Sequence, residues 1–161
     1  MIKFSIAKIQ ETAPYEIVLV GGSFNFVTDF GIHYSISFSK EDIVLGNTST
    51  YQFIIQKIDT EHSPHDDKVE KTIFSIINEF FRANKEVLLY ICDTSDGREA
   101  ARNRLFLSWF EREGNGRFII RTAKARIEEE VIYTAIIVAN DHPALQAILQ
   151  DFEEQKEMLE K

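Results

Sequence analysis

A short apolar run in the middle of the chain, from Val87 to Cys92, constrains the fold most. The run is rich in β-branched and aromatic residues, a composition typical of a strand that is buried on both faces. Small and polar residues follow it from Asp93 to Gly97, and such residues favour turns and helix caps. Because no β-branched residue occurs from Arg98 to Arg112, a helix is predicted there. The chain therefore leaves a central strand, turns once and enters a helix.

The start of this helix is predicted at Asp96, because Asp96 and Glu99 stand three residues apart and fit a capping box. Free backbone N–H groups at a helix start bind anions, so a carboxylate or phosphate site is one interpretation of the turn. A divalent cation held by Asp93 and Asp96 is a second interpretation. A structural turn, whose arginines pair with carboxylates of the protein itself, is the third. The candidate ligand-binding residues are Asp93, Ser95, Asp96, Gly97, Arg98 and Arg102.

The rest of the chain has alternating and helical hydrophobic patterns. They predict strands over 15–20, 24–28, 32–38, 51–58, 118–125 and 131–138, a helix over 66–83 and a C-terminal helix after Pro143. Residues 1–14 are weakly patterned, and residues 39–50 are predicted to be a polar connection. Either Asp66 or Asp67 is expected to cap the first helix, and Asn84 to end it.

This order predicts an α+β fold, with a mixed, mostly antiparallel sheet and three helices packed on it. At 161 residues the chain is expected to form a single domain, residues 1–161, whose helical tail over 153–161 frays. Helix 98–112 carries apolar residues widely around its circumference, namely Leu105, Phe106, Trp109 and Phe110. Either the C-terminal helix or a partner covers the part that the sheet does not, and the C-terminal helix is the expected one.

Composition restricts the classes of partner. The net charge of −8 argues against general nucleic-acid binding, and no apolar run is long enough to cross a membrane. One cysteine excludes an internal disulfide and fits a reducing compartment, so a cytoplasmic protein is predicted. Charge is uneven, since the window from Cys92 to Arg126 holds eight basic and five acidic residues. An anionic ligand near the central turn therefore stays possible on charge alone.

Metal and thiol chemistry have weak support. His62, His65 and Asp66 are weak metal candidates, because Pro64 lies between the histidines and distant ligands would be needed to complete a site. No metal is therefore predicted. Cys92 is expected to be a small buried apolar residue, since the adjacent Asp93 opposes a thiolate.

The run CDTSDGREAARNRLFLSWF, from Cys92 to Phe110, resembles an uncharacterised bacterial family that is catalogued only as a domain of unknown function. The resemblance spans most of the chain and implies no activity, substrate or catalytic residue.

The order of elements is similar to that of the acyl-CoA-dependent N-acetyltransferase fold from its second strand onward. This similarity implies acyl-CoA as a cofactor, held by a glycine-rich loop at the start of the helix after the meander. The corresponding stretch here, from His62 to Asp67, has no glycine and carries two carboxylates, which oppose a pyrophosphate.

The leading functional hypothesis is a non-enzymatic cytoplasmic module that binds a partner protein or forms a homo-oligomer and needs no cofactor. The alternatives are a divergent acyl-CoA-dependent N-acyltransferase-like protein and a binder of small anionic ligands. Whether the chain is an enzyme stays open from the sequence.

Overall fold

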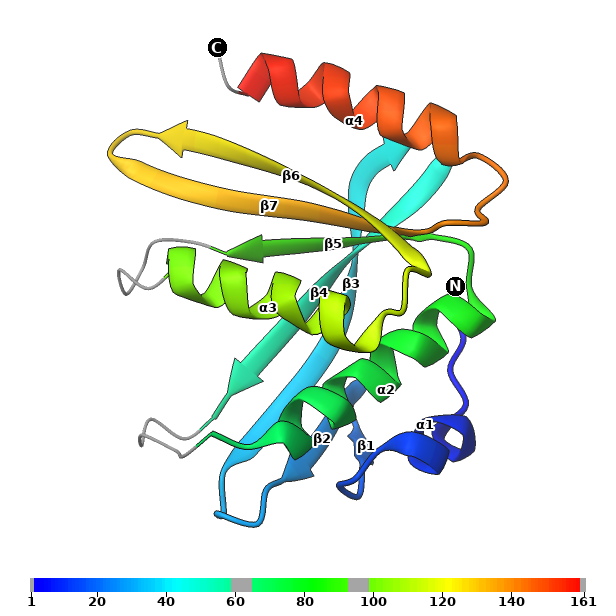
Figure 1. Cartoon of the computed structure of the whole chain (residues 1–161), viewed down its shortest axis with the longest axis vertical. Helices are drawn as coiled ribbons and strands as arrows, with labels where there is room; N and C mark the ends of the chain where they lie inside the picture. The colour runs from blue at the N-terminus through cyan, green and yellow to red at the C-terminus, as the bar shows by residue number, and fades with distance from the viewer. Residues whose placement is uncertain (1, 59–64, 93–98, 160–161) are drawn as a thin grey trace. The chain divides into compact units, whose positions relative to one another are not determined.

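The computed structural model describes residues 2–58, 65–92 and 99–159 (Figure 1). In this part of the chain it has an α+β fold, with a mixed seven-stranded sheet and four helices. The order of the strands in the sheet is β1-β2-β3-β4-β5-β7-β6. The elements are α1 (Ile6–Thr12), β1 (Val18–Val20), β2 (Ser23–Val27), β3 (His33–Leu45), β4 (Thr48–Lys57), α2 (Asp67–Ala83), β5 (Val87–Cys92), α3 (Glu99–Glu113), β6 (Phe118–Ile127), β7 (Glu130–Ala139) and α4 (Leu145–Leu159). The predicted fold class is confirmed, apart from the number of helices.

The additional helix is α1, in the weakly patterned N-terminal stretch. Ser5 caps it by accepting a hydrogen bond from the backbone N–H of Lys8 at 3.3 Å. The helix has seven residues, of which only Ile9 is buried, so it carries no repeated apolar stripe for the sequence to reveal.

The predicted polar connection over residues 39–50 is also wrong. Strand β3 continues to Leu45, and β4 begins at Thr48 after the turn at Gly46 and Asn47. Most residues from Ser39 to Val44 are exposed, so this half of β3 lacks the alternating pattern by which a half-buried strand is recognised.

The chain divides into two compact units. The first comprises residues 1–38 and 54–84, and the second comprises residues 39–53 and 85–161, so that β3 and β4 contribute to both. That the units form the single domain predicted from the sequence stays a prediction.

In the first unit, α2 carries the apolar stripe that its sequence predicts. Ile73, Ile76 and Ile77 are fully buried, and the ring of Phe80 stacks on Phe38 with the centroids 5.1 Å apart. Asn84 ends the helix as predicted, but its backbone is extended rather than left-handed. Its side-chain amide donates to the carbonyl oxygens of Phe80 and Lys3, at 3.0 and 2.8 Å, and its amide oxygen accepts from the N–H of Lys3 at 2.8 Å. The end of α2 therefore also holds the N-terminal segment.

A buried carboxylate joins α1 to α2 within the same unit. Glu79 is 3% exposed and accepts hydrogen bonds from the N–H of Ser5, at 2.6 Å, and from the guanidinium of Arg82. Burial alone would raise the pKa of Glu79, but these hydrogen bonds outweigh it and hold the pKa below its ordinary value.

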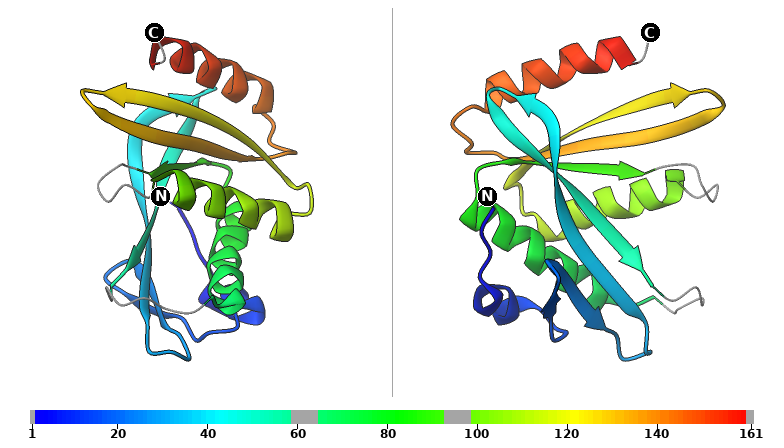
Figure 2. Two further views of the ribbon diagram at one scale, coloured as in Figure 1. Left: turned by 60° about the vertical axis from the view of Figure 1, so that its left-hand side comes forward. Right: turned by 180° about the vertical axis from the view of Figure 1, so that it is seen from behind.

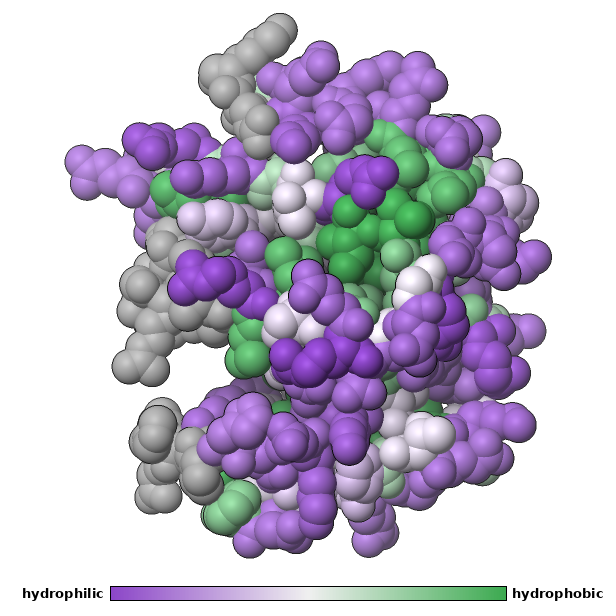
Figure 3. Space-filling model, viewed as in Figure 1, coloured by the Kyte–Doolittle hydropathy of each residue, from purple (hydrophilic) through white to green (hydrophobic). Residues whose placement is uncertain are grey.

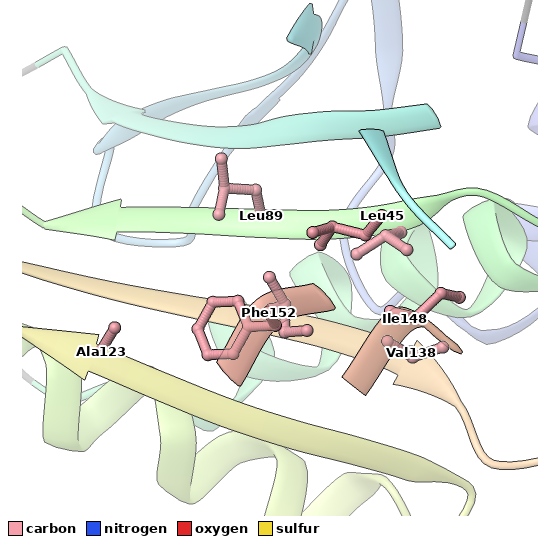
Figure 4. Close-up of a cluster of buried hydrophobic side chains, with 8 residues drawn as sticks. Leu45, Leu89, Ala123, Val138, Ile148 and Phe152 are labelled. Atoms are coloured by element: carbon pink, nitrogen blue, oxygen red, sulfur yellow. The ribbon is translucent and has the colours of Figure 1, made fainter. Parts of the chain in front are cut away.

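In the second unit, β5 separates two apolar layers. Leu89 and Val87 belong to a buried cluster with Leu45, Ile148 and Phe152, on the face covered by α4 (Figure 4). Tyr90 points to the opposite face, where its ring stacks on Phe106 of α3 with the centroids 3.9 Å apart. The two helices therefore cover opposite faces of this part of the sheet, and Figure 2 shows α4 beside the β6–β7 hairpin in two further views.

This arrangement corrects one expectation and confirms another. Phe106, Trp109 and Phe110 are buried, but the sheet rather than α4 covers Phe106, and Leu105 stays 48% exposed. Cys92 is buried at the end of β5, as predicted.

The two long strands predicted over 118–125 and 131–138 are confirmed, and they form a hairpin. Strands β6 and β7 pair antiparallel, from Phe118 with Ala139 to Ile127 with Glu130. The turn between them contains Glu128, whose φ is 58°. No helix in the described part of the chain is long and apolar enough to span a membrane.

Candidate functional site

The turn predicted to bind a ligand lies outside the described residues. Asp93, Ser95, Asp96, Gly97 and Arg98 all belong to the undescribed range 93–98. Arg102 lies in α3, but its side chain is also outside the described part. The anion-site, cation-site and structural-turn hypotheses for these residues therefore stay predictions.

The start of α2 holds two of the three weak metal candidates, and His62 lies outside the described residues. The Nε2 atom of His65 lies 2.7 Å from Oδ1 of Asp67. Asp66 is the N-cap of α2, where its Oδ1 accepts from the N–H of Lys68 at 3.0 Å, so the predicted cap is confirmed. Among the described residues, no group of three or more His, Cys, Asp or Glu side chains is placed to hold a metal ion.

Tyr15 completes a polar network at this helix start. Its hydroxyl donates to Oδ2 of Asp66 and accepts from the N–H of Asp29 at 3.2 Å. Burial, followed by the hydrogen bond to Asp66, raises the pKa of Tyr15 to about 12. Lys68 forms an ion pair with Asp29, with Nζ and Oδ2 2.9 Å apart, and this hydrogen bond raises the pKa of Lys68. These groups bond to one another and surround the helix start with carboxylates, which opposes an anionic ligand.

The outer edge of β6 forms the margin of the sheet in the second unit. Strand β6 is ten residues long and lies at the end of the strand order, so no described strand pairs with its outer side. The N–H of Asn140 donates to the carbonyl of Arg117 at 2.8 Å, and the register places these two residues opposite each other. Hydrogen-bonded pairs alternate along an antiparallel ladder, so odd-numbered residues of β6 bond to β7. The N–H and C=O groups of the even-numbered residues point outward, and we call this row the β6 edge: Phe118, Ile120, Thr122, Lys124 and Arg126.

Apolar surface surrounds the first half of the β6 edge. Figure 3 shows an apolar area over this part of β6 and the neighbouring part of α4. Phe118, Ile119 and Ile120 are only partly buried, as are Leu145 and Leu149 of α4. On the α3 side lies a shallow, open depression, lined by Phe110, Glu111, Gly114, Gly116, Phe118 and Ile120. An apolar side chain on an added strand would therefore find apolar surface on either face of the sheet.

Basic side chains occupy the second half of β6. Arg121, Lys124 and Arg126 are exposed, and no acidic residue occurs between Phe118 and Ile127. A guanidinium N–H of Arg121 donates to the outward carbonyl of Ile120 at 3.0 Å. Lys124 lies with Nζ 5.8 Å from the ring centroid of Tyr133. The strand thus combines an apolar half with a basic half.

A family model matches residues 65–154, and its description is "Family of unknown function (DUF6169)". The chain belongs to this family. The DUF6169 segment contains α2, β5, α3, the β6–β7 hairpin and most of α4, and therefore the whole β6 edge. A search of the curated proteins found none that matches.

The opposite edge of the sheet precedes the DUF6169 segment. It is formed by β1, whose residues Val18, Leu19 and Val20 are 52%, 52% and 62% exposed. With three residues, β1 offers few backbone groups to a partner, and very short edge strands are a common protection against association. We therefore regard the β6 edge, rather than β1, as the stronger candidate for a binding surface.

The sequence predicted β6 as a strand but not as a binding surface. Its basic residues contributed to a charge excess that was interpreted as support for an anionic ligand near the central turn. The missing information was the position of β7 between β5 and β6, which leaves β6 at the margin of the sheet.

Proposed function

We propose that this DUF6169 protein is a non-enzymatic module that binds a partner protein through the β6 edge. The observation that supports the proposal is a ten-residue edge strand with an outward row of backbone donors and acceptors beside apolar surface. An exposed edge of this length is a template for an added strand, because main-chain hydrogen bonds supply affinity and flanking side chains supply selectivity.

The polar groups of the first unit support a structural role for that unit. Three ionisable side chains of this unit form hydrogen bonds to other parts of the protein, namely Asp66, Glu79 and Tyr15. Their hydrogen bonds cap α2 and attach α1, which accounts for the altered pKa values of Glu79 and Tyr15 without a reaction.

The test compares the wild-type chain with Thr122→Pro. The N–H of Thr122 belongs to the outward row, so proline there removes no bond to β7, and proline is tolerated at such edge positions. We expect light scattering after size exclusion, or pull-down from a native lysate, to show self-association or a retained partner for the wild type only. Both proteins should melt at similar temperatures. A strictly monomeric wild type that retains no partner would contradict the proposal.

A second candidate is a divergent acyl-CoA-dependent N-acyltransferase-like protein. The observation that favours it is the parallel pairing of β4 with β5, which covers only Thr50 to Gln52 against Val87 to Leu89, although β5 continues to Cys92. Aromatic rings occupy the adjoining space, since Phe106 lies 5.7 Å from Phe53 and 3.9 Å from Tyr90, centroid to centroid. These rings and the acidic start of α2 weigh against acyl-CoA.

A thermal-shift screen with acyl-CoA, nucleotides and sugar phosphates separates the candidates, and it also tests the binding of small anionic ligands. A ligand at 100 times its dissociation constant stabilises the folded chain by about 2.7 kcal/mol. A shift with acyl-CoA that depends on the acyl group would support the second candidate. An unchanged melting temperature with every CoA species would eliminate it.

A further inference from the structure

We infer that the occupant of the β6 edge is an extended peptide segment with an apolar half and an acidic half, added as a further strand of the sheet. The inference rests on the proposed function and specifies the chemistry of the partner. It follows from three properties of β6: the direction of its backbone groups, the apolar surface at its first half and the charge of its second half.

The backbone sets the length of the segment. From Phe118 to Arg126 the outward row spans eight residue steps, which at 3.2–3.4 Å per residue is about 26 Å. A partner strand of about nine residues therefore pairs with the whole row. Its entry requires the Arg121 guanidinium to leave the carbonyl of Ile120, which then accepts from the incoming backbone instead.

The side chains set the composition of the segment. On the α3 face, Phe118 and Ile120 precede Lys124 and Arg126, and on the α4 face Ile119 precedes Arg121. Neighbouring strands place their side chains in contact on each face, and opposite charges there are stabilising. The segment that fits is therefore apolar beside Phe118 to Ile120 and acidic beside Arg121 to Arg126.

Charge disfavours a second copy of β6 as the occupant. Two β6 strands paired antiparallel over the whole row would set the basic half of each copy beside the apolar half of the other, and neither strand has an acidic residue. The basic side chains would then lack the opposite charges that stabilise paired strands. An acidic partner instead supplies the charge that neutralises the basic half of β6.

The probe is a fluorescent nine-residue peptide, with alternating valine and threonine in one half and alternating valine and glutamate in the other. Binding to the full chain is followed by fluorescence anisotropy. One control peptide carries lysine in place of each glutamate. A second keeps the glutamates but is N-methylated at alternate backbone amides, so that its charge is unchanged and its strand pairing is blocked.

The protein variants separate charge from backbone pairing. Arg121→Glu with Arg126→Glu reverses the charge of the edge, and Lys40→Glu with Lys71→Glu makes the same change of net charge at exposed positions elsewhere. We expect at least tenfold weaker binding of the acidic peptide to the first variant and an unchanged affinity for the second. The lysine peptide should show the opposite preference, and Thr122→Pro should bind neither peptide.

Each contrary result has a distinct meaning. Binding that survives N-methylation is electrostatic only and overturns strand addition. Tighter binding of a single-stranded oligonucleotide than of the peptide overturns a peptide occupant. If the acidic peptide fails to bind while Thr122→Pro still abolishes partner capture or self-association, the inferred partner is wrong and the proposed function stands. If partner capture and self-association are absent as well, both are wrong.

Discussion

Gly46 is the position at which a single methyl group should test the packing of the second unit most directly. It lies in the turn between β3 and β4, with φ of +55°, and its N–H donates to Oδ2 of Asp151 in α4 at 2.7 Å. A Cβ atom at Gly46 would lie 2.8 Å from the backbone nitrogen of Ile148 and 3.1 Å from the carbonyl carbon of Ala147. Gly46→Ala must therefore displace the turn from α4.

The expected loss of stability has two parts. An L-residue at this left-handed φ costs roughly 1–2 kcal/mol. Overpacking against a rigid neighbour costs roughly 1–3 kcal/mol more. The neighbour is rigid because the N–H of Ile148 already donates to the carbonyl of Ala144 at 3.0 Å within the first turns of α4. We expect the free energy of unfolding to fall by about 2–5 kcal/mol in total.

Gly21→Ala is the matched control, because Gly21 has φ of +56° and a Cβ atom added there would meet no other described part of the chain within 4 Å. It should lose only the conformational part, roughly 1–2 kcal/mol. Urea unfolding followed by circular dichroism measures both variants. Equal losses for Gly46→Ala and Gly21→Ala would refute the close approach of the turn to α4.

Three further predictions concern Glu79, Tyr15 and the central turn. Glu79→Gln should destabilise the chain by about 1–3 kcal/mol at pH 7. Because the pKa of Glu79 is lowered on folding, the difference in stability between wild type and variant should shrink as the pH falls below the pKa of Glu79 in the unfolded chain. Unfolding measured at a series of acidic pH values would show this. Because the pKa of Tyr15 rises from 10.0 to about 12 on folding, the wild type should lose stability, by about 3 kcal/mol at most, as the pH rises from 10 to 12. Tyr15→Phe should lose less over that range in denaturant melts, and a parallel decline of both proteins would contradict the network. Asp96→Ala should cost roughly 0.5–2 kcal/mol if Asp96 caps α3. Arg98→Ala with Arg102→Ala should barely change the melting temperature, and loss of ligand binding in that double variant would instead favour a binding turn.

Features that depend on neighbours in sequence were predictable from the sequence. Asp66 caps α2 because its carboxylate reaches an N–H two residues away, and Asn84 ends the helix through the carbonyl of Phe80. These contacts span only a few residues, so the residue types themselves carry the signal.

Elements without a distinctive pattern were not predictable in the same way. Helix α1 is short and buries one apolar residue, and the second half of β3 is exposed. Their stability comes from contacts with distant residues, such as the bond from the N–H of Ser5 to Glu79. A pattern of period two or 3.6 cannot appear where only one residue faces a core.

The sequence by itself determined the fold class, the central strand, the two long C-terminal strands and both ends of α2, because hydrophobic periodicity and capping are local properties. Only the tertiary structure decided which strands are neighbours and which faces the helices cover. Alternation shows that β6 has two faces but does not show that β7 lies between it and β5. Strand pairing joins residues far apart in the chain, so the open β6 edge and its basic half became recognisable as a surface only in three dimensions.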